Sequence, residues 1–363
     1  MKLGLVRRGY SPSGGAEAYL LRLAAELAHR GHELVLFSDV AWPDSALAAH
    51  HLVLPRVIIE ARTPRLFADG LESARAHHSL DLLFSLERIW SCDLYRAGDG
   101  VHAAWLEKRA RFEPAWQAWL RALNPKHRQI LDLERALFTG GARRIITNSA
   151  LIQHEITDYY DTPAERMIVV HNGLPHHSVA PGTRAEVRAE LGLAEGEYVA
   201  IFVGSGWERK GLRFAVEAVQ QMPGVILLVA GKGNSRGLDA EKRIRFLGPR
   251  SDVPRLLAAA DVFVLPTIYE PFSNACLEAF AAGLPVITTT ANGFSEIMAA
   301  GTDGEVIGNP SDIPALIAAI EHWRDPARRA AVRHRLLAHA ARFSIEENVE
   351  QTLAVIEELQ TQK

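Results

Sequence analysis

Two glutamates in the second half of the chain have the type and spacing of ligand-binding groups. Glu270 and Glu278 are separated by seven residues, and Glu278 lies about one turn inside a predicted helix that begins near Asn274. A carboxylate placed there can accept hydrogen bonds from vicinal hydroxyls, as acidic residues do on ribose. The ordinary alternative is that both are solvated surface side chains, and spacing alone does not decide between the two.

The start of the same predicted helix offers a place for an anion. The first amides of a helix have no partner within it, and the helix dipole adds partial positive charge there. Here these amides belong to Phe272, Ser273 and Asn274, which follow a predicted strand ending near Leu265. Open α/β sheets bind ligands at the carboxyl ends of their strands. We therefore expect a phosphate or sugar oxygens at this point, with Glu270 facing the same ligand.

A glycine-rich loop at residues 203–211 supplies cations. It contains Gly204 and ends on Arg209, Lys210 and Gly211. Glycine lets a backbone approach a ligand closely, and two adjacent cations suit a diphosphate. The alternative is an exposed basic pair on a loop.

Two turns in the first half of the chain are weaker candidates. Gly14 and Gly15 follow the first predicted strand, where a tight turn into a helix is sufficient explanation. Their spacing is not G-x-G-x-x-G, which disfavours a dinucleotide dehydrogenase. Asp99 stands between Gly98 and Gly100, close to His102. Local sequence favours a turn residue for Asp99, and a carboxylate facing a ligand is the alternative.

Alternating strands and helices must position these groups. Apolar runs predict strands at residues 3–6, 34–37, 82–84, 145–147, 199–203, 225–230, 244–247, 262–265 and 286–288. Helical patterns between them predict parallel crossover units of doubly wound α/β sheets. We predict two α/β domains, at residues 1–168 and 169–342, and a C-terminal helix within residues 343–363 that can pack back on the first domain.

Composition excludes several classes of protein. The 363 residues carry a formal net charge of −3, which argues against nucleic-acid binding through bulk positive charge. No apolar run reaches the roughly 18 residues of a membrane-spanning helix, and the amino end lacks a signal-peptide core. Cys92 and Cys276 cannot form a disulfide framework or a cysteine zinc site. We expect a reduced, cytoplasmic protein.

Residues 101–130 depart from this even charge balance. They hold six basic residues against two acidic ones, together with Trp105, Trp116 and Trp119. Tryptophans and cations on one segment fit an interfacial helix on an anionic leaflet. The protein would then be peripheral on the inner face of the cytoplasmic membrane. The alternative is a core-packed helix with a solvated basic face.

The paired glutamates, followed by Ala-Ala-Gly-Leu-Pro-Val, resemble the signature of the retaining glycosyltransferases of family four, and the resemblance covers nearly the whole chain. It implies the GT-B fold, with two Rossmann-like doubly wound domains facing a cleft. It implies that Glu270 lies beside the donor sugar and that Glu278 holds the nucleotide ribose. It further implies that Arg209 and Lys210 neutralise the donor diphosphate without a metal, and that Gly14 and Gly15 approach it.

Within that family the chain is similar to the lipopolysaccharide glucosyltransferase I branch, the heptose glucosyltransferases. This similarity implies that Asp99 is the candidate base facing the acceptor hydroxyl. The branch has an Ala-Asp pair where this chain has Gly98-Asp99, and His102 also differs, which weakens the assignment. The similarity also implies a lipid-anchored saccharide acceptor and membrane docking through residues 101–130.

These observations predict a metal-independent retaining hexosyltransferase that moves glucose from UDP-glucose to a hydroxyl of a lipid-linked or lipopolysaccharide-core saccharide, with no bound cofactor. The catalytic residues would be Asp99, Glu270, Arg209 and Lys210. The donor site would comprise Gly14, Gly15, Gly204, Arg209, Lys210, Glu270, Phe272, Ser273, Asn274 and Glu278.

Several alternatives stay open. A GDP-mannose or UDP-N-acetylhexosamine transferase would keep every phosphate-binding feature. A non-catalytic nucleotide-sugar-binding scaffold at the membrane, or a sugar-nucleotide epimerase of similar fold, would need no acceptor. The histidine pairs at residues 77–78 and 176–177 do not predict a metal site, because adjacent imidazoles usually point apart.

Overall fold

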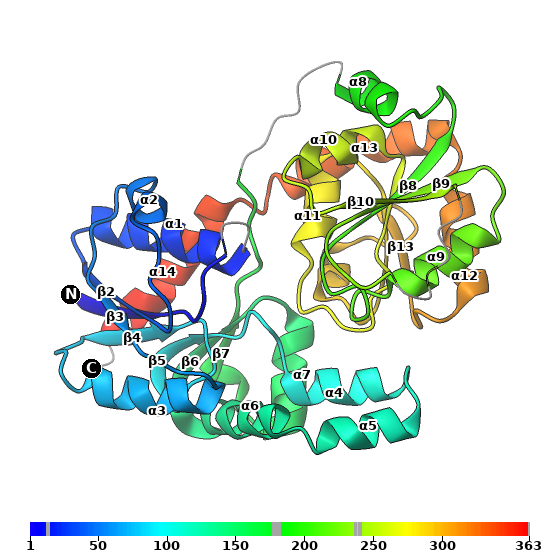
Figure 1. Ribbon diagram of the computed structural model, residues 1–363. Helices are drawn as coiled ribbons and strands as arrows, with labels where there is room; N and C mark the ends of the chain where they lie inside the picture. The colour runs from blue at the N-terminus through cyan, green and yellow to red at the C-terminus, as the bar shows by residue number, and fades with distance from the viewer. Residues whose placement is uncertain (12–14, 176–182, 236–237, 239–241, 362–363) are drawn as a thin grey trace. The chain divides into compact units, whose positions relative to one another are not determined.

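The chain divides into two compact units. The computed structural model describes residues 1–11, 15–175, 183–235, 238 and 242–361. Unit 1 comprises Met1–His171 and Ile345–Lys363, and unit 2 comprises Asn172–Ser344 (Figure 1). The division after His171 lies close to the boundary predicted at residue 168. Gly14, one of the predicted donor-site residues, lies outside the described residues.

Unit 1 is built on a parallel sheet. Its strands follow the order β3-β2-β1-β4-β5-β6-β7, in which the chain first runs to one edge and then to the other. This order is that of a doubly wound α/β sheet. The strands are β1 (Lys2–Val6), β2 (Glu33–Ser38), β3 (Arg56–Ile58), β4 (Leu82–Ser85), β5 (Cys92–Arg96), β6 (Ala142–Thr147) and β7 (Met167–Val169).

The sequence predicted no residue range for β3, β5 or β7. β3 and β7 are three residues long, and β5 reads Cys-Asp-Leu-Tyr-Arg, in which charged residues interrupt the apolar run. Apolar runs identify buried strands, so strands this short or this polar give too weak a pattern. Their pairing with neighbours in the sheet makes them strands.

Helices surround the sheet of unit 1. They are α1 (Gly15–His29), α2 (Asp44–Ala48), α3 (Pro64–Arg75), α4 (His102–Ala110), α5 (Ala115–Ala122), α6 (Pro125–Ala136), α7 (Ala150–Tyr160) and α14 (Ile345–Thr361), with short turns at Leu137–Gly141 and Ala164–Arg166. Local sequence sets several of their starts. The side chains of Thr63 and Ser149, for example, accept hydrogen bonds from the amides of Leu66 and Ile152, as N-caps do.

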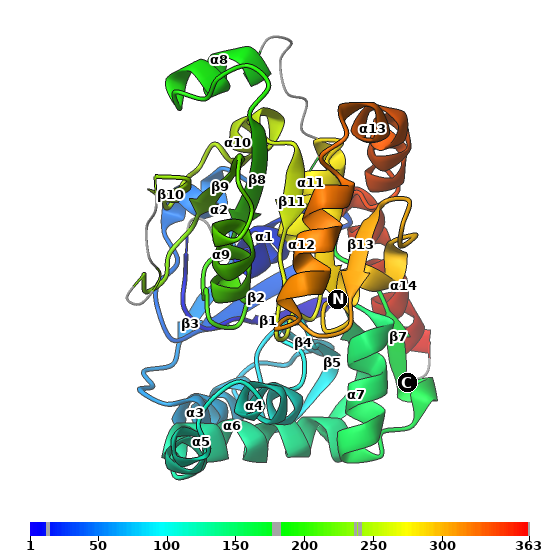
Figure 2. The same cartoon turned by 90° about the vertical axis from the view of Figure 1, so that its right-hand side faces the viewer.

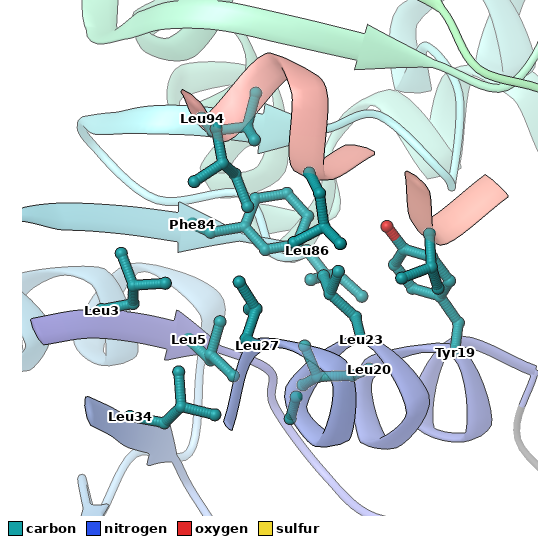
Figure 3. Packing of buried hydrophobic residues seen from close by; sticks show 14 of the residues in the cluster. Leu3, Leu5, Tyr19, Leu20, Leu23, Leu27, Leu34, Phe84, Leu86 and Leu94 are labelled. Carbon is teal, nitrogen blue, oxygen red and sulfur yellow. The ribbon is translucent and has the colours of Figure 1, made fainter. Parts of the chain in front are cut away.

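The C-terminal helix α14 belongs to unit 1. It packs against α1, and its buried side chains include Leu353 and Ile356, in the same apolar core as Leu23. The hydroxyls of Tyr19 and Thr352 are 3.1 Å apart inside this core. Figure 3 shows the α1 side of the core, where leucines of the helix face Phe84 and Leu94 of the sheet. The chain therefore returns from unit 2 to complete unit 1.

Unit 2 is a second parallel sheet, with the order β10-β9-β8-β11-β12-β13. The strands are β8 (Tyr198–Val203), β9 (Val225–Ala230), β10 (Ile244–Gly248), β11 (Val262–Val264), β12 (Val286–Thr289) and β13 (Gly304–Ile307). The helices are α8 (Thr183–Glu190), α9 (Leu212–Gln220), α10 (Val253–Ala259), α11 (Asn274–Ala281), α12 (Ile313–His322) and α13 (Pro326–Ala340), with a short turn at Gly293–Ile297.

The centre of this second sheet is apolar because both of its faces are covered. Every residue of β8 and of β9 is buried, as expected for strands of a parallel sheet between helices. Helices α9 and α12 pack together beside it (Figure 2). The carboxyl ends of β8 and β11, which are neighbours in the sheet, carry the loops that hold the predicted donor residues.

In the described ranges, no helix is both long enough and apolar enough to cross a membrane.

Candidate active site

Unit 2 brings the predicted cations and the first glutamate together. Lys210 Nζ lies 2.8 Å from Glu270 Oε2, and Arg209 Nη2 lies 3.4 Å from the same oxygen. The side chains of Lys210 and Glu270 are 13% and 9% exposed, whereas that of Arg209 is 34% exposed. Glu270 therefore lies in a nearly dry, positively charged environment, and Arg209 is the more accessible of the two cations.

Backbone contacts fix this arrangement. The carbonyl of Arg209 accepts hydrogen bonds from the amide of Ile268 and from the hydroxyl of Thr267, both at 2.9 Å. Thr289 at the end of β12 donates in turn to the carbonyl of Thr267 at 2.7 Å. The amide of Glu270 donates to the carbonyl of Ala291. The loops after three adjacent strands are thus joined to one another around the ion pair.

Two glycines permit close approach within this site. Gly204 has a φ of +154°, and a Cβ there would lie 2.5 Å from Cδ of Lys210. Gly211, with a φ of +71°, is the N-cap of α9, and a Cβ there would lie 1.9 Å from the carbonyl oxygen of Pro266. A side chain at either position would meet both steric conflict and backbone strain. Gly204 therefore leaves the space through which the Lys210 stem passes.

Glu278 lies on α11 and is half-buried. Burial raises the pKa of its carboxyl to about 7, and the charge of Lys210 opposes that rise. Lys210 thus acts electrostatically on both glutamates of the predicted motif. Burial makes this carboxyl costly to charge in the free protein. Hydrogen bonds donated by the hydroxyls of a ligand, such as those of a sugar, would stabilise its charged form.

The start of α11 is partly used by the protein itself. Ser273 is the N-cap, and its hydroxyl accepts from the amide of Cys276 at 3.2 Å. The side-chain oxygen of Asn274 accepts from the side-chain amide of Asn172 at 2.8 Å. Phe272 is buried and packs against Phe294 with ring centroids 5.6 Å apart. The side chains of these three predicted donor residues therefore have structural contacts within unit 2.

The first-half candidates lie in unit 1. Gly15 is the first residue of α1. Asp99 is on an exposed turn after β5, with 67% of its side chain exposed and its Oδ2 lying 3.9 Å from a guanidinium nitrogen of Arg88. His102 Nε2 lies 2.9 Å from His127 Nδ1. Burial lowers the pKa of His102 to about 4, so its ring is neutral at pH 7 and hydrogen-bonded to another histidine.

A buried network that the sequence did not predict lies beside Asp99. Glu134 of α6 is fully buried, and its carboxylate accepts from Arg88 Nε at 2.9 Å and from the Tyr160 hydroxyl at 2.6 Å. It also accepts from the amides of His102 and Ala103 at 2.6 and 3.1 Å. No local signal marks Glu134, because it is one of several charged residues on a polar helix.

A second, partly buried carboxyl lies at the same carboxyl-terminal end of the sheet. Glu87 follows β4 and accepts from Arg7 Nη1 at 2.6 Å, while the same arginine donates to Glu17 at 3.0 and 3.2 Å. Burial raises the pKa of Glu87 to about 7, although Arg7 opposes the rise. The carboxyl ends of β1, β4 and β5 therefore gather charged side chains that the sequence did not single out.

The segment at residues 101–130 folds as α4, α5 and the start of α6, and the expectation of one interfacial helix is wrong. Prolines at 114 and 125 stand at the starts of α5 and α6, where proline interrupts a longer helix. Trp105 is half-buried. On α5 and just after it, apolar side chains at helical spacing are exposed, by 51–63%: Trp116, Trp119, Leu120 and Leu123.

Several of the cations in this segment are paired. Arg111 lies 2.6 Å from Glu107, Arg109 lies 3.5 Å from Glu113, and Lys108 pairs with Glu155. The net positive charge of the segment is therefore less available than the sequence suggested. Lys126 and Arg128 of α6 are exposed.

In the part of the chain that the structure describes, no group of three or more His, Cys, Asp or Glu side chains could hold a metal ion. The pair at residues 176–177 lies outside that part.

Two parallel α/β sheets, with cations and paired glutamates gathered at the strand ends of the second, define a class of protein: the glycosyltransferases with the GT-B fold. The crystal structure of WaaG, a glycosyltransferase involved in lipopolysaccharide biosynthesis, matches with a TM-score of 0.80 and 23% identity, covering 96% of this chain and 98% of WaaG. Anabaena HepE in complex with UDP-glucose matches with a TM-score of 0.73 and 20% identity, over 99% of this chain and all of HepE.

The chain belongs to glycosyltransferase family 4. The model described as Glycosyltransferase Family 4 matches residues 13–177, and that of the group 1 glycosyl transferases matches residues 197–325. D-inositol 3-phosphate glycosyltransferase of Mycobacterium sp. (strain KMS) is 32% identical, over 94% of this chain and 84% of the relative. Lipopolysaccharide glucosyltransferase WaaG of Escherichia coli (strain K12) is 27% identical over 83% of each chain. The protein is therefore a glycosyltransferase.

Proposed function

We propose that this glycosyltransferase transfers glucose from UDP-glucose, with retention of configuration and without a metal, to a hydroxyl of a lipid-linked or lipopolysaccharide-core saccharide. The observation that carries the proposal is the meeting of Lys210, Arg209 and Glu270 at the strand ends of unit 2. The names of two relatives support the acceptor and the donor in this proposal. One is a lipopolysaccharide glucosyltransferase, and the other was crystallised with UDP-glucose.

The donor diphosphate would bind to Arg209 and Lys210. Charge builds on a nucleoside diphosphate as it leaves, and fixed cations in a poorly solvated site stabilise that charge more than water does. Lys210 is mostly buried and held by Glu270 in the free protein. The diphosphate would share this ammonium with Glu270. Two such cations supply the positive charge that other transferases obtain from a metal ion.

Glu270 and Glu278 would hold the two ends of the donor. We propose that Glu278 accepts hydrogen bonds from the ribose hydroxyls and that Glu270 orients the transferred glucose. The side chain of Glu270 pairs with Lys210, and its backbone amide donates to the carbonyl of Ala291. Together these two contacts fix the direction of the Glu270 side chain. Orientation of this kind lowers the barrier by removing unproductive geometries before the reaction.

For the chemical step we favour front-side displacement. The bond from the anomeric carbon to the diphosphate oxygen breaks, and the acceptor oxygen bonds to that carbon on the same face of the sugar. The acceptor proton then passes to the departing phosphate. Asp99 of unit 1 would hold the acceptor hydroxyl. Retention follows because the incoming and outgoing oxygens share one face.

The proposed lipid-linked acceptor goes together with a proposed attachment of the protein to the membrane. The exposed apolar side chains of α5, with Lys126 and Arg128 nearby, fit shallow insertion into an anionic leaflet. A protein held in this way on the inner face of the cytoplasmic membrane would meet lipid-linked saccharides at high local concentration.

One other acceptor has specific support. The relative with 32% identity is a D-inositol 3-phosphate glycosyltransferase, so an inositol phosphate is the second candidate. Donors such as GDP-mannose or a UDP-N-acetylhexosamine would use the same cations. A non-catalytic membrane scaffold would bind the donor without turnover, and an epimerase would convert it without an acceptor.

The first test is thermal unfolding of the protein with UDP, UDP-glucose, UDP-N-acetylglucosamine and GDP-mannose, with and without EDTA. A ligand that binds the native state raises the unfolding temperature, and the rise grows with the logarithm of the ligand concentration relative to its dissociation constant. We expect UDP and UDP-glucose to stabilise the protein equally in both buffers. A response to GDP-mannose instead would overturn the glucose donor, and a response abolished by EDTA would overturn metal independence. No response to any nucleotide would leave the donor site without support.

A transfer assay then tests the acceptor. Radiolabelled UDP-glucose is incubated with lipopolysaccharide truncated to its heptose-bearing inner core, or with inositol 3-phosphate. Label in the lipopolysaccharide supports the proposal, and label in inositol 3-phosphate favours the second candidate. Conversion of the donor without either acceptor would indicate hydrolysis or epimerisation.

A further inference from the structure

Backbone hydrogen bonds fix the turn that carries Asp99. The amide of Ala97, at its start, donates to the carbonyl of Ile146 at 2.8 Å, and the amide of Gly100 donates back to the Ala97 carbonyl at 3.1 Å. Gly100 has a φ of +69°, in the region that glycine adopts readily. Asp99 therefore projects from a closed turn, although its carboxylate is largely exposed.

Two side chains hold the carbonyls on either side of Asp99. Asn148, buried at the end of β6, donates from Nδ2 to the carbonyl of Gly98 at 3.2 Å. Arg88, which follows β4, donates from Nη2 to the carbonyl of Gly100 at 2.7 Å. β4 and β6 are the two neighbours of β5 in the sheet. The peptide units around Asp99 are thus held from both adjacent strands.

Arg88 is itself held in place. Its Nε donates to the fully buried carboxylate of Glu134 at 2.9 Å, and Glu134 also accepts from the Tyr160 hydroxyl and from the first amides of α4. Arg88 has 13% of its side chain exposed. A guanidinium bound to a buried carboxylate on one side and to a carbonyl on another has a single favourable orientation. The third nitrogen of this group is the one that lies 3.9 Å from Asp99 Oδ2.

We propose that Arg88, anchored by Glu134, and Asn148 are positioning residues that fix the direction of the Asp99 carboxylate toward the acceptor. The inference rests on the proposed function, in which Asp99 holds the acceptor hydroxyl. An aspartate between two glycines would otherwise lose considerable backbone entropy on reaching one productive geometry. A displacement of about 1 Å at such a group can cost about 100-fold in rate.

The test compares Arg88→Met, Asn148→Ala and Asp99→Asn by kinetics and by hydrogen exchange. UDP-glucose and inner-core lipopolysaccharide are the substrates. We expect Arg88→Met to lower kcat about 100-fold, and Asn148→Ala to lower it less. UDP affinity, measured by calorimetry, should be unchanged, since Arg209, Lys210 and Glu278 lie in unit 2. Amides of residues 97–101 should exchange faster in Arg88→Met and in Asn148→Ala, while those of β8 and β9 should not.

A double variant separates positioning from stability. If Arg88 acts through Asp99, Arg88→Met should add little to the loss already caused by Asp99→Asn. An equal further loss in the Asp99→Asn background would overturn the proposal, as would unchanged exchange of residues 97–101. Arg88→Lys, which keeps the charge, serves where Arg88→Met fails to fold and should recover part of the activity. Arg143→Met is the matched control, because Arg143 pairs with Asp93 at 3.1 Å on the same sheet.

Failure of the proposed function would look different. If the native protein transfers glucose to neither acceptor, the assignment of the reaction fails. The exchange comparison then still decides whether Arg88 and Asn148 hold the turn, since it needs no substrate. If Asp99→Asn leaves kcat unchanged, both the role of Asp99 and its positioning are overturned, while donor binding stands.

Discussion

Lys210 and Glu270 form an ion pair of 2.8 Å between the loops that follow two neighbouring strands, β8 and β11. Glu270 is mostly buried, so the pair is less screened than a surface pair would be. In the proposed function, a diphosphate arriving at Lys210 would meet an ammonium whose position is already set. That preset position would lower the reorganisation needed when charge develops on the leaving group.

Replacement of Lys210 by alanine should lower kcat about 100- to 1,000-fold, the range found when one preorganised donor to a developing anion is removed. The KM for UDP-glucose should change less, because Arg209 would still contact the diphosphate in the proposed site. Steady-state kinetics with radiolabelled UDP-glucose measures both constants. Lys242→Ala, on the exposed surface of the same unit, should retain native activity. Full activity of Lys210→Ala would show that the diphosphate is held elsewhere.

Gly204→Ala should reduce turnover while leaving unit 2 folded. The new Cβ would lie 2.5 Å from Cδ of Lys210 in a backbone conformation with φ of +154°. The lysine stem has to move, and the backbone is strained by about 1–3 kcal/mol. We expect kcat to fall at least tenfold and the unfolding temperature to drop by a few degrees.

The matched control for Gly204 is Gly308→Ala, because a Cβ at Gly308 meets no atom within 4 Å. Its activity and unfolding temperature should stay near native. Native kinetics in Gly204→Ala would contradict the role of that glycine in placing Lys210.

The pH dependence of stability should reveal Glu278. Burial raises its pKa to about 7 in the folded protein, from an ordinary value of 4.5. The folded state therefore favours the protonated carboxyl. This contribution to the free energy of unfolding is complete below about pH 4.5 and is lost as pH rises through about 7. Between pH 5 and 8 the native protein should lose about 1–3 kcal/mol relative to Glu278→Gln.

Urea unfolding at a series of pH values measures the difference, with Glu217→Gln as a surface control in unit 2. Parallel pH profiles for the native protein and Glu278→Gln would disprove the raised pKa.

Calorimetry on the same variants tests the ribose assignment, because Glu278→Gln should weaken UDP binding. Unchanged affinity would remove that assignment.

Binding to lipid should depend on α5. Trp116 and Trp119 are each 63% exposed, and insertion of such side chains into the headgroup region favours binding in proportion to the apolar area buried. Changing both to alanine should weaken binding to vesicles containing 30% phosphatidylglycerol at least tenfold, as measured by sedimentation. Leu66→Ala is the control, since Leu66 is an exposed apolar residue of α3 in the same unit.

Salt separates the two parts of this interaction. Exposed cations such as Lys126 and Arg128 attract an anionic surface less as ionic strength rises. Binding of the native protein should fall between 50 and 300 mM NaCl. Equal binding to neutral vesicles would disprove the electrostatic contribution, and unchanged binding of the double tryptophan variant would disprove insertion by α5.

The sequence alone predicted the strands and site residues whose pattern lies within a short stretch of chain. Runs such as 198–203 and 225–230 are apolar throughout, because a strand between two helical layers has no solvated face, and this pattern alone indicates parallel α/β architecture. The glutamate pair and the Arg209-Lys210 pair are close in sequence to strand ends. The family and the fold were therefore predictable from residues 199–288.

Contacts between distant segments decided the rest. β5 has too many polar residues for its bounds to be predicted, yet pairing on both sides makes it a central strand. Residues 101–130 were predicted to form one interfacial helix, but prolines divide them into several helices. Ion pairs with acidic side chains neutralise part of their positive charge. The exposed apolar stripe of α5 depends on which side chains its neighbours leave uncovered.

What the sequence by itself determined is the alternation of strands and helices typical of parallel α/β domains, the family, and the residue types at the ends of the predicted strands, because these follow from local hydrophobic pattern and short motifs. What only the tertiary structure decided is which charges meet. Glu134 is a charged residue on a polar helix until folding removes it from water, and then it must be paired. Its partner Arg88 and the turn of Asp99 come from other elements of the fold, and only their packing brings them together.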